Sequence, residues 1–306
     1  MKVPFLFCLR LERNGEKMKQ ILNQNAVLEC IEQTPYITFP AFESFDRLVC
    51  GFSTRLGGVS RGCFASMNLG FARGDSEENV MENYRRLCKN LGIVPERLVF
   101  TDQVHNTVVR QATAADCGKG MIYQRDYSGV DGHITNESNV PLLVFGADCV
   151  PVFLYDHAQH AIGAVHAGWK GTAGKIAAVA VKRMQEAFGS RAKDIIAVIG
   201  PSIGSECYEV GKEVADVFYQ VFYNVEGIVQ KKQKESSTEE TNSAADLEKY
   251  MLDLWEANRY VLMEAGVLSE NISVSGLCTM CRQDLFFSHR ATNGRRGSMA
   301  GFIMLR

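Results

Sequence analysis

Several short apolar runs rich in β-branched residues follow one another in the middle of the chain, and they constrain its fold more than any other feature. They cover residues 107–109, 129–135, 141–155, 161–166 and 195–199. Apolar runs of this length, bounded by turn residues, are typical of strands buried on both faces. We therefore predict a largely buried sheet at the centre of the protein.

Helical periodicity before and after these runs indicates helices that cover the sheet. Residues 75–91 begin with Asp-Ser-Glu-Glu, a helix start signal, carry apolar side chains at helical spacing, and reach Gly92. Residues 172–188 have the same period, which predicts a strand, helix, strand unit and an α/β fold. Weaker patterns predict helices at 212–223 and 247–261, strands at 48–52 and 272–276, and a solvated loop at 230–245.

Composition narrows the classes of protein to consider. The 306 residues suffice for one large domain, and a net charge of -2 gives no long-range attraction for nucleic acid or an anionic membrane. No apolar stretch is long enough to span a membrane. Ten cysteines scattered among apolar segments indicate free thiols in a reducing compartment. We expect a cytoplasmic enzyme acting on a small molecule, with an oligomeric state that the sequence leaves open.

Two ionisable residues, Asp148 and Cys149, interrupt the apolar run at 141–155. They can be a hydrogen-bonded aspartate beside a core cysteine, because free cysteine packs as a small apolar residue. We nevertheless interpret Asp148 and Cys149 as part of a functional site, because the next apolar run ends at His166, just before a glycine-rich loop and a helix. His105 is predicted to open another short strand.

Two imidazoles and one thiolate from separate segments suit a catalytic zinc site, which uses three protein ligands and leaves one position open. Copper is permitted by the same donors, so these residues leave the metal identity open. The loop at 168–175 and Lys170 can hold an anion, but its spacing is not that of a nucleotide-binding P-loop. Arg55 and Arg290 also lie in loops where a guanidinium can grip phosphate.

Three further cysteines receive a structural interpretation. Cys278 and Cys281 form an isolated C-x-x-C without the second pair of a zinc module, so we interpret them as ordinary thiols. Cys207 follows the loop at 200–204, which comes after the predicted strand at 195–199, and we expect its side chain to pack in the protein interior.

Six segments together resemble the multicopper polyphenol oxidase, or laccase-domain, family of purine nucleoside phosphorylases. They are STRLGGVS at 53–60, QVH at 103–105, ADCVP at 147–151, HAGWKG at 166–171, GPSIG at 200–204 and FSHR at 287–290. The resemblance covers nearly the whole chain after residue 40. It divides the chain into residues 1–40, an N-terminal extension with the first elements, and residues 41–306, the catalytic domain.

The resemblance implies a layered α-β-β-α fold and a zinc ion on His105, Cys149 and His166. It implies phosphorolysis of adenosine, inosine and methylthioadenosine to the free base and a ribose 1-phosphate, with adenosine deamination as a side activity. On that basis we expect Arg55, Lys170 and Arg290 to position phosphate and Asp148 to move a proton during deamination. His289 and the 230–245 segment depart from the family's pattern.

Three other functions stay open on the sequence alone. A copper-dependent phenol oxidase would need more ligands than one His/His/Cys set supplies. A metal-free hydrolase acting on a cell-wall precursor could use Cys149 as nucleophile and a histidine as base. A binding module without catalysis would tolerate Cys149→Ala.

Overall fold

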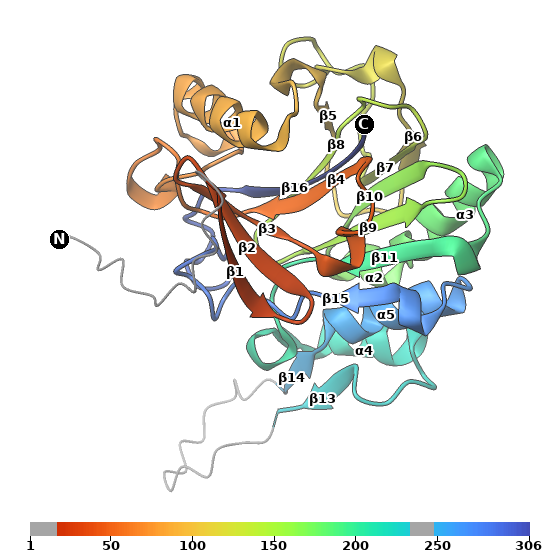
Figure 1. The fold of residues 1–306 in the computed structure, drawn as a ribbon. Coiled ribbons are helices and arrows are strands. Elements are labelled where there is room, and N and C mark those ends of the chain that lie inside the picture. Colours follow the sequence, from red (N-terminus) through yellow and green to blue (C-terminus); the bar gives the residue numbers. More distant parts are fainter. Residues whose placement is uncertain (1–16, 233–247) are drawn as a thin grey trace, which may run out of the picture.

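The computed structural model describes residues 17–232 and 248–306, and two sheets packed face to face form its centre (Figure 1). The first sheet contains, in spatial order, β1 (Lys17–Asn23), β2 (Ala26–Ile31), β3 (Thr34–Thr38), β4 (Leu48–Ser53), β16 (Met299–Leu305), β8 (Leu142–Gly146) and β5 (Val99–Phe100). The second contains β15 (Ile272–Val274), β11 (Ile195–Ile199), β9 (Val150–Asp156), β10 (Ala161–Ala167), β7 (Gly132–Thr135) and β6 (Val109–Gln111).

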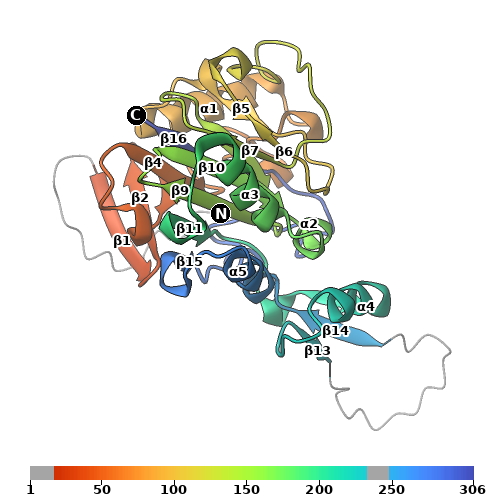
Figure 2. The same cartoon turned by 90° about the vertical axis from the view of Figure 1, so that its right-hand side faces the viewer.

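Helices cover the outer face of each sheet. Helix α1 (Glu77–Leu91) packs Val80, Tyr84 and Leu87 against the first sheet. On the second sheet lie α2 (Trp169–Ala173), α3 (Ile176–Phe188) and α5 (Leu254–Glu264), whereas α4 (Lys212–Val221) packs beside α2 at one end of the molecule (Figure 2). This order of layers confirms the predicted α-β-β-α fold in a single domain.

The space between the two sheets holds an aromatic core. Phe52 of β4 and Phe153 of β9 are fully buried there, together with Ile303 of β16. Both sheets therefore contribute apolar faces to one core, which explains why the central runs are apolar throughout rather than alternating.

A small third sheet stands beside this sandwich. It consists of β12 (Glu209–Gly211), β14 (Lys249–Leu252) and β13 (Val229–Lys231), and Figure 2 shows β13, β14 and α4 together at one end of the molecule. Residues 233–247, most of the predicted polar loop, lie outside the described residues. Among the described residues, no helix is long and apolar enough to cross a membrane.

Several predicted elements are confirmed. Helix α1 begins after Ser76, whose hydroxyl accepts a hydrogen bond from the Asn79 N–H, and it ends at Gly92 in the left-handed conformation. The strand at 195–199 is β11, and β10, α3 and β11 form the predicted strand, helix, strand unit. The exposed turn at residues 157–160 carries His157 and His160.

Two predicted helices are wrong in part. The helix at 247–261 begins only at Leu254, because Tyr250 and Leu252 bury alternate side chains in β14, which pairs with β12 and β13. The helix at 172–188 is divided into α2 and α3, because Lys175 between them adopts a left-handed φ of 59°. The strand predicted at 107–109 starts only at Val109.

Candidate metal centre

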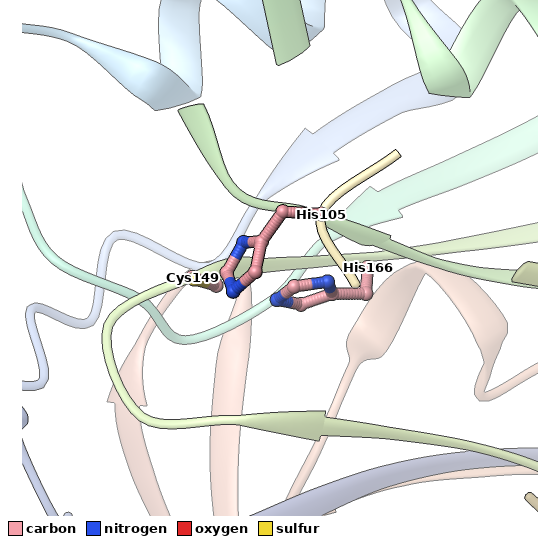
Figure 3. Close-up of side chains that lie close together, drawn as sticks. All are labelled: His105, Cys149 and His166. Atoms are coloured by element: carbon pink, nitrogen blue, oxygen red, sulfur yellow. The ribbon is translucent and has the colours of Figure 1, made fainter. Parts of the chain in front are cut away.

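His105, Cys149 and His166 meet in the folded chain although they lie in three separate segments (Figure 3). Their ligand atoms all lie within 4.8 Å of one another. Cys149 occupies the short connection where the chain leaves β8 in the first sheet and enters β9 in the second. His166 is near the end of β10, which pairs directly with β9. His105 was predicted to open a strand, but it lies in a turn before β6.

Asp131 holds two of the three candidate ligands in place, and the sequence analysis missed it. Its carboxylate accepts hydrogen bonds from the backbone N–H groups of residues 104, 105 and 106 at 3.0–3.1 Å. The same carboxylate lies 2.8 Å from Nδ1 of His166 and is fully buried. One charged group therefore fixes the His105 turn, which has a left-handed φ of 63°, and the orientation of the His166 ring.

This arrangement fits a bound metal ion. With Nδ1 of His166 directed at Asp131, Nε2 is the nitrogen that remains for a metal. The His105 and His166 rings are 4.8 Å apart between centroids and inclined at 68°. Two imidazole nitrogens and one sulfur match the donors of catalytic zinc sites, and copper uses the same donors. The structure therefore contains a three-residue set that is able to hold zinc or copper.

The electrostatics of the set favour a thiolate at Cys149. Burial opposes the charge, but His166 and hydrogen bonds with both histidines lower the pKa of Cys149 to about 6. Burial also disfavours the imidazolium of His166, yet Cys149 and Asp131 raise the pKa of this histidine to about 9. A thiolate is the form that binds metal and the form that acts as a nucleophile.

Gly168, the residue before α2, leaves the room that the ligands need. A Cβ atom at this position would lie 2.6 Å from Nδ1 of His105 and 3.2 Å from Sγ of Cys149. The first separation is shorter than real Cβ contacts allow, so any side chain here would displace the His105 ring. Glycine at this position thus permits the close approach of the chain to the site.

The candidate metal centre opens into a cavity of about 470 Å³. Its wall includes all three candidate ligands and Phe71, Phe145, Gln103, Arg73, Arg125 and Arg296. The volume is in the range of pockets that hold small organic ligands. Asp102 also lines the cavity and pairs with Arg125 at 2.7 Å, so the positive charge of the wall comes from Arg73 and Arg296.

Arg296, a loop arginine that the sequence analysis ranked below Arg55 and Arg290 as a phosphate residue, lies in this wall and is 8% exposed. Its Nη1 donates to the carbonyl of Gly297 and the hydroxyl of Ser298, whereas its buried Nε has no hydrogen-bond partner. Burial and the nearby Arg73 lower the pKa of Arg296 to about 10, which leaves it charged at neutral pH. A buried cation with an unpaired donor indicates a place for an anionic ligand.

The predicted phosphate residues lie outside this cavity wall. Arg55 donates to the backbone carbonyls of Ala65 and Gln283 and covers the Phe287 ring, so three of its five N–H donors are already used. Lys170 is exposed beside Trp169, with Nζ 5.5 Å from the centre of that ring.

Asp148 and Arg290 are joined to each other instead of facing the candidate ligands. One oxygen of Asp148 accepts from the Thr279 hydroxyl at 2.7 Å, and the other accepts from the Arg290 backbone N–H at 2.6 Å. The Arg290 side chain donates to the carbonyl of Glu209 and lies over Tyr208. Asp148 has a left-handed φ of 94°, and these two hydrogen bonds hold the turn that precedes Cys149.

Comparison with known proteins identifies relatives of this architecture. Residues 49–306 match the family described as "Multi-copper polyphenol oxidoreductase laccase". Purine nucleoside phosphorylase YlmD of Bacillus subtilis is 40% identical over 260 residues, which are 85% of this chain and 89% of that protein. A purine nucleoside phosphorylase of Bacteroides thetaiotaomicron is 35% identical over 87% of this chain and 95% of that protein.

Solved structures agree with these sequence matches. The crystal structure of YlmD from Geobacillus stearothermophilus superposes with a TM-score of 0.80 at 36% identity, covering 91% of this chain and 98% of that one. The Bacillus licheniformis protein YfiH superposes with a TM-score of 0.78 at 34% identity, covering 94% and 99%. The chain therefore belongs to the multi-copper polyphenol oxidoreductase laccase family, in which the relatives compared above include proteins named purine nucleoside phosphorylases.

Proposed function

We propose that this chain is a metal-dependent purine nucleoside phosphorylase. It would cleave adenosine, inosine and methylthioadenosine with phosphate, releasing the free base and the corresponding ribose 1-phosphate, and would deaminate adenosine as a side activity. The observation that carries this proposal is the His105, Cys149 and His166 set opening into a cavity with a buried, incompletely paired Arg296. The names of the relatives support the reaction class.

Phosphate is assigned to the arginine side of the cavity. Arg73 and Arg296 both donate to the Ser298 hydroxyl, which anchors their guanidinium groups in the same wall. A phosphate placed there would offset the repulsion between the two cations and supply an acceptor for the unpaired Nε of Arg296. This assignment replaces Arg55, Lys170 and Arg290 in the phosphate-binding role.

The purine is assigned to the apolar part of the wall. Phe71 and Phe145 line the cavity and are only half-buried, so they offer ring surface to a planar base. Phe71 is itself stacked on the buried Tyr84, with ring centres 5.7 Å apart, which holds it in position. Stacking against aromatic surface accepts adenine and hypoxanthine alike, in keeping with several purine substrates.

In phosphorolysis a phosphate oxygen bonds to C1′ of the ribose while the N-glycosidic bond breaks and the purine leaves with the electron pair and takes up a proton. The arginines hold the phosphate beside C1′, which removes much of the entropic cost of bringing two substrates together. A bound metal ion would act as a Lewis acid and lower the pKa of bound water. Asp131 holds the backbone of His105 and the ring of His166, so this part of the site is organised before substrate enters.

Zinc is the proposed metal, with copper as the second choice, because both accept imidazole and thiolate ligands. The free thiols of the nine described cysteines suit a reducing compartment, and we place the enzyme in the cytoplasm.

One competing function has an observation in its favour. The lowered pKa of Cys149 beside His166 would also serve a metal-free hydrolase with a cysteine nucleophile.

The test is incubation of the purified protein with inosine, adenosine or methylthioadenosine, with and without phosphate, after removal and restoration of zinc or copper. We expect free base and ribose 1-phosphate only when phosphate and metal are both present, and some inosine from adenosine. Turnover without phosphate would contradict the phosphorylase. Oxygen uptake on a phenol would favour the oxidase, and amide cleavage by metal-free protein, lost on alkylation of Cys149, would favour the hydrolase.

Substitutions at the adjacent residues Arg296 and Arg295 provide a test and a matched control for the proposed phosphate-binding role of Arg296. Arg296→Lys keeps the charge but removes the planar donor group, so we expect the KM for phosphate to rise about tenfold or more, the equivalent of one or more charge-assisted hydrogen bonds. Arg295→Lys, in an exposed position, should leave this KM unchanged. Equal effects of the two substitutions would contradict the assignment.

A further inference from the structure

A second group of metal-binding side chains lies outside the cavity. Cys207, Cys278 and Cys281 place their three sulfur atoms within 4.8 Å of one another. The Sγ atoms of Cys207 and Cys281 are 3.3 Å apart, although 74 residues separate them in the chain. The sequence analysis interpreted Cys278 and Cys281 as an isolated pair, and it missed the third thiol because no local pattern links Cys207 to them.

The backbone around Cys278 prepares its sulfur to carry negative charge. Sγ of Cys278 accepts a hydrogen bond from the Gly204 N–H at 3.2 Å and one from the Cys281 N–H at 3.4 Å. Hydrogen bonds from N–H groups to sulfur stabilise the thiolate over the thiol. The thiolate is the form that binds metal, and an ordinary packed cysteine has no need of two donors.

The two segments that carry these cysteines are fixed to each other independently of the thiols. Residues 202 and 278 form an isolated parallel bridge, and the Thr279 N–H donates to the carbonyl of Ser202 at 3.0 Å. The hydroxyl of Ser202 in turn accepts from Nε1 of Trp255 at 2.6 Å. The sulfur atoms are therefore brought together by a built framework and not by the chance meeting of mobile side chains.

We propose that Cys207, Cys278 and Cys281 form a second metal site, which binds a thiophilic cation such as Zn²⁺ through three thiolates. Three sulfur ligands leave the fourth zinc position to water or another external donor on the side of Cys281, which is exposed. Such an ion would clamp the loop after β11 to the turn after β15. That turn carries Thr279, which donates to Asp148 next to Cys149, so the clamp would also support the connection that presents the first centre.

The decisive protein is the Cys149→Ser variant, in which the candidate centre in the cavity lacks its thiolate. We expect this variant to retain one zinc ion per chain after desalting, and to give thiolate-to-cobalt charge-transfer absorption when loaded with Co²⁺. Adding Cys278→Ser should remove the cobalt band and weaken zinc binding about tenfold or more, as losing one of three ligands requires. Adding Cys63→Ser, at an exposed cysteine outside the cluster, should change neither.

Circular dichroism and thermal unfolding identify a variant that fails to fold, and Cys207→Ser then serves as the second test of the cluster. Retention of the cobalt band after either substitution would overturn the proposal. So would absence of bound zinc or cobalt in the folded Cys149→Ser chain. A mass deficit of two hydrogens that disappears on reduction and maps to Cys207 and Cys281 in the freshly isolated protein would replace the metal site by a disulfide.

Discussion

Replacing Asp131 by asparagine tests how the candidate metal centre is organised. The carboxylate accepts hydrogen bonds from three backbone N–H groups and from His166, two on each oxygen. Asparagine has the same shape, but one oxygen becomes an NH₂ group that cannot accept, so two donors lose their partner in either side-chain orientation: two part-buried backbone N–H groups, or the third one and buried His166. The loss of a fixed outer partner typically lowers metal affinity about 10- to 100-fold, which is about 1.4–2.7 kcal/mol.

Stability should fall as well. Two unsatisfied donors at about 1–3 kcal/mol each predict a loss of about 2–6 kcal/mol in the free energy of unfolding, an upper range because the turn at 104–106 can relax toward solvent. Zinc affinity is measured by competition with a chromophoric chelator in the Cys278→Ser background, in which zinc binding at the proposed second site is weakened. Stability is measured by denaturant unfolding of the metal-free protein.

Asp116→Asn is the matched control for this substitution. Asp116 is also buried, and it accepts from Arg110, Lys119 and the Thr113 N–H, but it contacts none of the candidate ligands. We expect it to lower stability while leaving zinc affinity unchanged. Wild-type zinc affinity in folded Asp131→Asn, or an equal loss of affinity in both variants, would refute the reasoning.

Three further predictions concern the space at Gly168, the thiolate form of Cys149 and the protonation of His133. Gly168→Ala should displace the His105 ring and lower zinc affinity about tenfold or more, which chelator competition checks; unchanged affinity would contradict the close contact. In metal-free protein, alkylation of Cys149 by iodoacetamide should rise with pH around about 6, and bound zinc should suppress it, as peptide mapping by mass spectrometry would show. Burial lowers the pKa of His133 to about 3 in the folded protein. The neutral histidine therefore favours the folded state above pH 6.5, and this contribution to the free energy of unfolding is lost as the pH falls from 6.5 toward 3. The slope over that range is up to about 1.4 kcal/mol per pH unit. His133→Leu should flatten the stability profile over that range and exposed His160→Leu should not; identical profiles would contradict the burial effect.

Much of the fold could be predicted because its signals are local. The buried strands of the two sheets are short β-branched runs, and α1 has its own start and stop residues in Ser76 and Gly92. The helix predicted at 247–261 was partly wrong because Leu247, Tyr250, Met251 and Leu254 recur at helical spacing, whereas Tyr250 and Leu252 also fit strand alternation. Pairing of β14 with β12 and β13, which decides between them, is not encoded within the segment.

Two of the candidate ligands could be predicted because Cys149 interrupts an apolar run and His166 ends one, whereas His105 was found beside a predicted strand that starts only at Val109. Asp131 carried the same signal, as a charged residue inside the predicted strand at 129–135, but only the folded chain shows that it binds the 104–106 turn. The roles of arginines were harder to predict. Arg55 and Arg296 both follow or precede glycine-rich loops, and what distinguishes them is which backbone carbonyls lie nearby after folding.

The account depends most on a metal at His105, Cys149 and His166 being required for phosphorolysis. The direct measurement is the rate of ribose 1-phosphate formation from inosine and phosphate as zinc is added back to metal-free protein, beside the same titration of Cys149→Ser. We predict that activity returns with zinc in the wild type and stays at the background level in the variant. Full activity of the metal-free wild type, or equal recovery in Cys149→Ser, would contradict the account.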